Sequence, residues 1–210
     1  MNCRAVVFGL LLVLSGAAEA DLVEGRDYLA IGPVPVDSGQ RIEVIEFFFY
    51  GCETCYRIEP VLREWVIRRE QYIEFKLIPA LRRSAWIPLS DLFFALHAVG
   101  ALPELHDRVY LAIHEQGRRL SSTSEQIKWA AEQGLDATVF EQTLHSDATM
   151  IATQNARDAT IAYDIRVTPS IVVDGRYLTT AAMIGNASRV SQVLDRLLEL
   201  ASAARRGGLP

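Results

Sequence analysis

Cysteine is scarce in this sequence, and positive charge does not predominate. Only three of the 210 residues are cysteines, and the formal net charge is −5. A chain without a net basic field is a poor candidate for binding nucleic acid through its phosphates. The absence of a second cysteine pair and of a close histidine pair disfavours a four-ligand zinc site. No phosphate-cradling glycine loop is present, so we expect no metal, nucleotide or flavin cofactor.

Residues 1–20 have the pattern of a secretory signal peptide. A short positive region at Arg4 precedes a compact apolar stretch, residues 5–16, which is too short to span a bilayer comfortably. The sequence AEA that follows has the small-x-small form of a cleavage site. We expect the protein to be exported and cleaved after Ala20, which removes Cys3. The alternative interpretation of residues 1–20 is an uncleaved membrane anchor.

Removal of the signal peptide leaves two cysteines in the mature chain, Cys52 and Cys55. A single close pair cannot connect distant loops. The loop that it closes is also too small to constrain the unfolded chain much. Stability is therefore not the expected purpose of this pair.

The segments around the pair predict a strand, a helix and a strand. Residues 22–40 indicate an irregular, turn-rich connector. Residues 41–50 (RIEVIEFFFY) predict a strand that is apolar on both faces, as in the centre of a sheet. Gly51 permits a tight exit, residues 55–70 have the spacing of an amphipathic helix, and residues 72–80 alternate as a second strand. This order predicts a parallel βαβ unit.

The middle of the chain has helical periodicity and no convincing strand. The predicted helices are residues 90–100, 103–117, 121–134, 136–146 and 148–165. We expect Ser124 to cap the third of these helices and Asp136 to cap the fourth. Four histidines fall in this region without the spacing of metal ligands on one face, and we expect them at the surface or at helix ends. They are His97, His106, His114 and His145.

Strand character returns near the C-terminus. Residues 169–179 contain an Asp-Gly pair that predicts a hairpin, and residues 186–206 predict a final amphipathic helix. The expected fold class is therefore α/β. An α/β domain of residues 21–83 and 147–206 is interrupted by an all-helical insertion at residues 84–146.

The position of Cys52 at the start of a helix predicts its chemistry. Unpaired backbone N–H groups and the helix dipole favour an anion there, and a thiolate is such an anion. Cys55 lies one turn further along and is more shielded. We expect Cys52 to be the nucleophile and Cys55 the resolving thiol, so that disulfides exchange through a mixed disulfide on Cys52.

Other interpretations of Cys-x-x-Cys are weaker. Zinc lacks further ligands, and covalent haem attachment needs a histidine where Tyr56 stands. An inert structural disulfide remains open as an alternative.

The sequences FYGCETCYRIEP and VTPSIVVDG, together with the helical insertion, resemble the DsbA-type branch of the thioredoxin superfamily. These proteins are periplasmic thiol–disulfide oxidoreductases. The resemblance covers the whole mature chain and implies a thioredoxin fold with a helical domain inserted after the second strand. It also implies that Val167, Thr168 and Pro169 form a substrate-binding loop that faces the cysteines, with a cis bond before Pro169. An ordinary trans turn is the alternative.

The resemblance gives a role to Glu46, because an acid at this place lies buried beneath the disulfide in such proteins. From the residues alone, Glu46 is either exposed at a strand end or desolvated, and desolvation raises its pKa so that it can hold a proton for Cys55. The remaining alternative is a structural acid paired with Lys76 or an arginine.

The two residues between the cysteines depart from the family pattern. Glu53 and Thr54 stand where DsbA-type oxidases most often have proline and histidine. The negative charge of Glu53 opposes thiolate formation at Cys52. We therefore expect a less extreme Cys52 pKa, and a weaker oxidant, than in strongly oxidising relatives.

These observations favour an oxidoreductase that passes its disulfide to exported cysteine-containing proteins in the periplasm. The resemblance implies reoxidation by a DsbB-like membrane quinone reductase, and we expect a monomer. The alternatives are a reductase or isomerase kept reduced by a DsbD-like partner, and a chaperone-like binding protein with a structural disulfide.

Overall fold

The protein is described here by a computed structural model that covers residues 21–36 and 38–207. The predicted signal peptide and its cleavage site after Ala20 lie outside the described residues.

The strands of the described chain form one five-stranded sheet in the order β1-β5-β4-β2-β3. They are β1 (Leu29–Ala30), β2 (Ile42–Phe48), β3 (Ile73–Pro79), β4 (Ser170–Val173) and β5 (Tyr177–Thr180). β2 and β3 are parallel, and the other neighbours are antiparallel. The predicted βαβ unit and hairpin are confirmed. The prediction that residues 22–40 are irregular is wrong at β1, whose two residues depend on pairing with β5.

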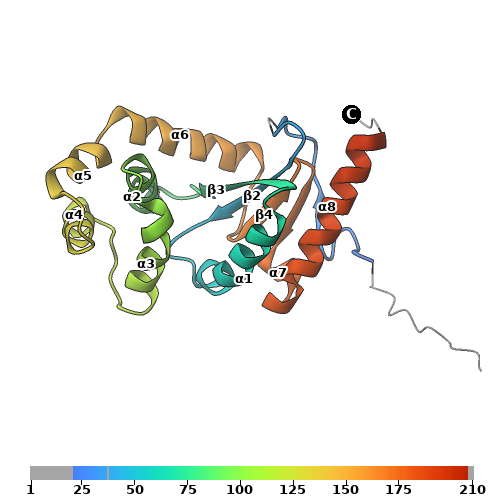
Figure 1. The fold of residues 1–210 in the computed structure, drawn as a ribbon, viewed down its shortest axis with the longest axis horizontal. Coiled ribbons are helices and arrows are strands. Elements are labelled where there is room, and N and C mark those ends of the chain that lie inside the picture. The colour runs from blue at the N-terminus through green and yellow to red at the C-terminus, as the bar shows by residue number, and fades with distance from the viewer. Residues whose placement is uncertain (1–20, 37, 208–210) are drawn as a thin grey trace, which may run out of the picture.

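The longer helices lie where the periodicity predicted them, with ends that differ by about one turn, whereas the short helix at Ala181–Ile184 was not predicted. They are α1 (Glu53–Arg69), α2 (Ile87–Ala98), α3 (Leu102–His114), α4 (Thr123–Glu132), α5 (Ala137–Leu144), α6 (Asp147–Ala162), α7 (Ala181–Ile184) and α8 (Val190–Gly207), with 3-10 turns at Ser84–Trp86 and Ala187–Arg189. Figure 1 shows α2 to α5 gathered beside the sheet, with α6 running from them back along it. Within the described residues, no helix combines the length and apolar character needed to cross a bilayer.

One of the two predicted helix caps is wrong. Ser122, not Ser124, caps α4, because its side chain accepts from the backbone of Glu125 while the Glu125 carboxylate accepts from the backbone of Ser122. This reciprocal capping box satisfies two otherwise unpaired N–H groups. Asp136 caps α5 as predicted, and its carboxylate accepts from the N–H of Val139 at 2.9 Å.

The hairpin turn requires the glycine that the sequence places there. Asp174 and Gly175 both have positive φ, 56° and 63°, which is the conformation of the turns that join tight hairpins. A Cβ atom at Gly175 would lie 2.2 Å from the backbone oxygen of Val34. Any other residue at position 175 would therefore displace the connector that precedes β2.

Every residue of β2 is buried, because helices cover both faces of the sheet. Val44 packs in an apolar cluster with α1 and α8, whereas Phe47 packs in a second cluster with residues at the end of α6. Successive side chains of a strand point to opposite faces. Glu46 therefore shares the face of Val44, beneath α1.

The end of β2 and the start of α1 join the sheet to the helical region. Phe48, Tyr50 and Cys55 belong to a third apolar cluster whose other members come mainly from α2 to α5, including Leu96 and Trp129. The segment that carries both cysteines therefore lies where these two parts of the molecule meet.

Candidate active site

Cys52 occupies the N-cap of α1 with extended backbone dihedral angles, φ −90° and ψ 112°. Its half-buried Sγ accepts a hydrogen bond from the N–H of Cys55 at 3.3 Å, and in the thiol form it donates to the carbonyl oxygen of Thr168 at 3.3 Å. The pKa of Cys52 is lowered to about 5, chiefly by the hydrogen bond from the Cys55 thiol. Burial raises the pKa, whereas the Thr168 side chain and the N–H groups of Cys55 and Thr54 lower it further. Cys52 is thus an ionised sulfur at neutral pH.

Cys55 has the opposite surroundings. Its side chain has no exposed surface, and burial, followed by its hydrogen bond to Cys52 and the charge of Glu46, raises its pKa far above the ordinary value. No disulfide joins these two cysteines in this structure. One sulfur is accessible and ionised while the other is enclosed and protonated, which is the asymmetry needed by a nucleophile and a resolving thiol.

Glu46 lies fully buried beneath the cysteines. Among the described residues, neither of its carboxylate oxygens has a hydrogen-bond partner. Burial first, and then the charges of Glu59 and Cys52, raise its pKa well above the ordinary value. The alternative pairing with Lys76 is not formed, because the Lys76 ammonium donates to Glu43 at 2.6 Å. The role of Glu46 as a proton donor to Cys55 stays a prediction.

Glu53 and Thr54 are both exposed. The Glu53 carboxylate forms an ion pair with Arg57 one turn along α1, and its side chain is 65% exposed. Solvent and Arg57 therefore screen the charge that the sequence places next to Cys52. The expected effect of Glu53 on Cys52 stays a prediction.

The loop before β4 faces the cysteines from a distant part of the sequence. The Thr168–Pro169 bond is cis, and Thr168 contacts the Cys52 sulfur through its carbonyl. Val167 is 51% exposed, and its carbonyl accepts from the Ser170 hydroxyl at 2.8 Å. The fold therefore brings Thr168 to the sulfur of Cys52, and the role of residues 167–169 in substrate binding stays a prediction.

Aromatic side chains flank the cysteines on the side of α2. Phe49 stacks on Trp86, with ring centroids 4.2 Å apart and an interplanar angle of 8°. A Cβ atom at Gly51 would lie 2.5 Å from the Phe49 ring. Gly51 is therefore required by the close approach of this ring.

Two histidines lie at this site: the sequence prediction is wrong for the burial of His106, whereas His114 lies at a helix end as expected. His106 is not at the surface: it is buried, and its Nδ1 lies 2.8 Å from the Tyr50 hydroxyl. His114 is half-buried at the end of α3, with its Nε2 2.7 Å from the carbonyl oxygen of Tyr50. His97 and His145 are exposed as expected. His106 and His114 are eight residues apart and share one face of a helix, but this spacing does not show which element packs against that face.

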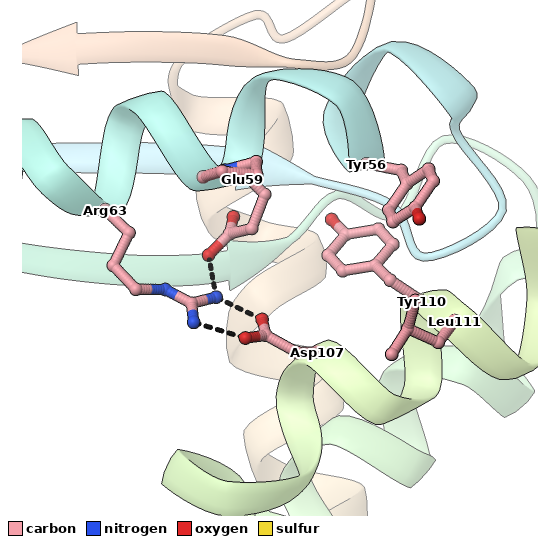
Figure 2. A pocket seen from close by; sticks show the side chains of 7 residues that line it. Tyr56, Glu59, Arg63, Asp107, Tyr110 and Leu111 are labelled. Carbon is pink, nitrogen blue, oxygen red and sulfur yellow. Dashed lines mark hydrogen bonds and ion pairs between the residues drawn. The ribbon is translucent and has the colours of Figure 1, made fainter.

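An ion-pair network connects α1 to α3 beside these histidines (Figure 2). Arg63 donates to the Glu59 carboxylate at 2.7 Å and also pairs with Asp107 of α3. Burial raises the pKa of Glu59, but nearby His106 and Arg63 outweigh it, so that the pKa is lowered. In Figure 2 the rings of Tyr56 and Tyr110 face each other next to this network. No group of His, Cys, Asp or Glu side chains in the described part of the chain is arranged to hold a metal ion.

The sheet, the helical region and the two unlike sulfurs define a thioredoxin-fold thiol–disulfide oxidoreductase. The comparison with protein families is in agreement: residues 43–198 match the model of the DSBA-like thioredoxin domain. The chain belongs to this family, and it is an enzyme of the thiol–disulfide oxidoreductase class. The predicted fold class and family are confirmed.

Individual relatives match nearly the full chain. The thiol:disulfide interchange protein DsbA of Azotobacter vinelandii is 32% identical over 200 residues, which cover 95% of this chain and 94% of that protein. The DsbA of Burkholderia cepacia is 33% identical over 193 residues, which cover 91% of each chain. The crystal structure of Pseudomonas aeruginosa DsbA superposes with a TM-score of 0.82 at 30% identity, covering 87% of this chain and 95% of that one.

Proposed function

We propose that this oxidoreductase acts as an oxidase of exported proteins, with Cys52 as the sulfur that meets the substrate. The observation that carries the proposal is the Cys52 sulfur itself, half-buried at the start of α1 with a pKa of about 5. A thiolate this stable is a good leaving group, and a disulfide that yields such a thiolate is readily reduced by substrate thiols.

The reaction follows from the positions of the two sulfurs. A substrate thiolate attacks Sγ of Cys52, the Cys52–Cys55 bond breaks, and Cys55 leaves and takes a proton from the Glu46 carboxyl group. A second substrate thiolate then attacks the substrate sulfur of the mixed disulfide, which forms the substrate disulfide and releases Cys52 as a thiolate. Two electrons pass from the substrate dithiol to the enzyme.

The other parts of the site have supporting roles in this proposal. Val167, Thr168 and Pro169 receive the extended backbone of the substrate beside Cys52, and Glu53 and Thr54 moderate the oxidising strength. We further propose cleavage after Ala20, action in the periplasm as a monomer, and the domain division at residues 84–146. Reoxidation falls to a DsbB-like membrane quinone reductase.

A reductase or isomerase served by a DsbD-like partner is the second candidate, and Glu53 and Thr54 are the observation that favours it. The two functions differ in the redox state that the enzyme keeps. Alkylation of freshly isolated protein should find the Cys52–Cys55 pair mainly as a disulfide for an oxidase, and mainly as a dithiol for a reductase.

Substrate capture tests the roles of the two cysteines. A Cys55→Ala variant should accumulate mixed disulfides with exported cysteine-containing proteins, because Cys52 can attack but nothing inside the enzyme resolves the bond. A Cys52→Ala variant is the matched control and should capture none, since Cys55 is buried. Equal capture by both variants would contradict the assignment of Cys52 as nucleophile.

A further inference from the structure

The backbone just before Cys52 is held by a side chain of the helical region. The carbonyl oxygen of Tyr50 lies 2.7 Å from Nε2 of His114. A carbonyl oxygen can only accept, so Nε2 of His114 must carry the hydrogen. This contact fixes the tautomer of the ring and ties the last residue of α3 to the peptide unit that leads into Gly51 and Cys52.

The same imidazole also contacts the residue that follows Cys55. The rings of His114 and Tyr56 are parallel, with centroids 4.9 Å apart and an interplanar angle of 1°. The Tyr56 hydroxyl donates to the carboxylate of Glu115, the residue after His114. The end of α3 therefore contacts the chain on both sides of the two cysteines.

Tyr50 is anchored at its other end by the same helix. Its hydroxyl lies 2.8 Å from Nδ1 of His106, and its side chain is buried. The two histidines lie two helical turns apart and therefore on one face of α3. With Tyr50 fixed at its carbonyl and at its hydroxyl, little freedom is left to the short segment between β2 and α1.

The position of this segment matters because the sulfur of Cys52 contacts two separate elements at once. Sγ is 3.3 Å from the N–H nitrogen of Cys55 and 3.3 Å from the carbonyl oxygen of Thr168. Hydrogen bonds weaken steeply with distance and misalignment. A displacement of Cys52 from this position weakens the hydrogen bond that the N–H of Cys55 donates to its sulfur, and that bond lowers the pKa of Cys52.

We propose that His114 is a positioning residue for disulfide exchange: it holds the Tyr50 carbonyl and the Tyr56 ring, and so fixes Cys52 between the start of α1 and the loop that carries Thr168. The inference rests on the proposed function of Cys52 and adds a residue outside the cysteine motif. His114 touches neither sulfur and acts through the backbone.

Two substitutions distinguish the effect of the N–H donor of His114 from the effect of its aromatic ring. His114→Gln retains an amide N–H that can reach the Tyr50 carbonyl, whereas His114→Phe retains the stacking on Tyr56 and has no donor. We expect His114→Phe to raise the Cys52 pKa, measured from thiolate absorbance. The equilibrium constant with glutathione should then shift by about threefold toward the protein disulfide, because each tenfold corresponds to one unit of pKa.

The matched variants distinguish positioning from folding. His114→Gln keeps a donor and loses the stacking on Tyr56, so it should raise the Cys52 pKa by less than His114→Phe does. His97→Phe, which changes an exposed histidine of α2, should titrate like the wild type. If His114→Phe lowers the thermal midpoint but leaves the Cys52 titration unchanged, or if His114→Gln is as impaired as His114→Phe, the inference is overturned. A wild type that does not equilibrate with glutathione at all would instead overturn the proposed function.

A measurement on the wild type covers the case in which His114→Phe does not fold. Nitrogen-15 NMR of the imidazole should find hydrogen on Nε2 of His114. A neutral ring with hydrogen on Nδ1 alone cannot donate to the Tyr50 carbonyl, and that result would overturn the inference.

Discussion

Two glutamates three positions apart on β2 have opposite surroundings. Glu43 is buried with its carboxylate bound to the Lys76 ammonium at 2.6 Å. Glu46 is equally buried and has no such partner among the described residues. A buried carboxyl group without a partner is costly when ionised, so its retention indicates a function rather than a contribution to stability.

Replacing this group should stabilise the fold at alkaline pH. The raised pKa of Glu46 means that the folded state keeps a proton that the unfolded state releases, so stability falls as pH rises above the ordinary carboxyl range. Glu46→Gln removes the ionisation. We expect its free energy of unfolding to exceed that of the wild type by about 1–3 kcal/mol at pH 8, and the difference should shrink toward pH 4 in denaturant titrations.

The control for this prediction is Glu43→Gln on the same strand. It removes the partner of Lys76 and should lower the free energy of unfolding at pH 8, opposite in sign to Glu46→Gln. If both variants lose stability to the same extent at pH 8, the Glu46 carboxylate has a stabilising partner as Glu43 does. Its proposed role as a proton donor then loses its basis.

The sequence allowed part of the site to be predicted at the residue scale. An acid within VIEFFF and a cysteine after a strand are local patterns, and local patterns place Cys52 and raise the possibility of a buried Glu46. The burial of His106 and the contact of His114 with the Tyr50 backbone could not be predicted, because both depend on which element packs against α3. Their partner Tyr50 is more than 50 residues away, beyond the reach of any periodicity.

At the scale of elements, α3 is held against α1 by polar contacts across an apolar interface. Arg63 spans the gap to Asp107, and the cavity beside this ion pair has a volume of about 250 Å³. Glu59 is almost fully buried, and His106 and Arg63 together compensate its charge. The helical region is thereby tied to the helix that begins at Cys52.

The contribution of the N-cap of α4 to stability can be measured by substituting the two candidate serines. Ser122→Ala should lower the free energy of unfolding by about 0.5–2 kcal/mol, because it leaves an N–H group at the start of α4 without an acceptor. Ser124→Ala, two residues further on, should change it by less than about 0.5 kcal/mol. Denaturant titrations of the two variants measure both values, and equal losses would contradict the capping box at Ser122.

The strong elements were predictable and the weak ones were not. Long periodic segments such as α1 and α6 carry their own signal, as does a strand as apolar as β2. The run SSTS offers four capping residues, and only the glutamate three positions after Ser122 selects among them. β1 has no signal of its own, because its two residues become a strand only when β5 lies beside them.

At the scale of the whole molecule, the site lies where the helical cluster meets the sheet. Cys55 packs with residues of α2 to α5, while the loop at Thr168 belongs to the chain that leads into β4. The order of these segments was predictable from the sequence. Their convergence on one sulfur depends on the packing of the complete fold.

The stability of the whole molecule should depend on its redox state and on pH. In the reduced enzyme the folded pKa of Cys52, about 5, lies below the value of about 8.5 for an unfolded cysteine. The stabilisation is therefore fully present above the unfolded pKa and is lost as pH falls through about 5. The free energy of unfolding of the reduced wild type, measured relative to Cys52→Ala, should increase between pH 5 and pH 8.

The Cys52→Ala variant is the reference here because it retains Glu46 and every other titrating group. A difference between the two proteins that stays constant from pH 5 to pH 8 would show that the folded state does not stabilise the Cys52 thiolate.

The enclosure of Cys55 sets the fate of a captured polypeptide. A client joined to Cys52 can escape unchanged only if Cys55 attacks inward, and that requires an enclosed thiol with a strongly raised pKa to give up its proton. Release of the unoxidised substrate by attack of Cys55 is therefore slow, while the second cysteine of the substrate approaches from solvent. The resulting long lifetime of the mixed disulfide favours substrates whose second cysteine reaches it slowly, so that they leave with their own disulfide formed.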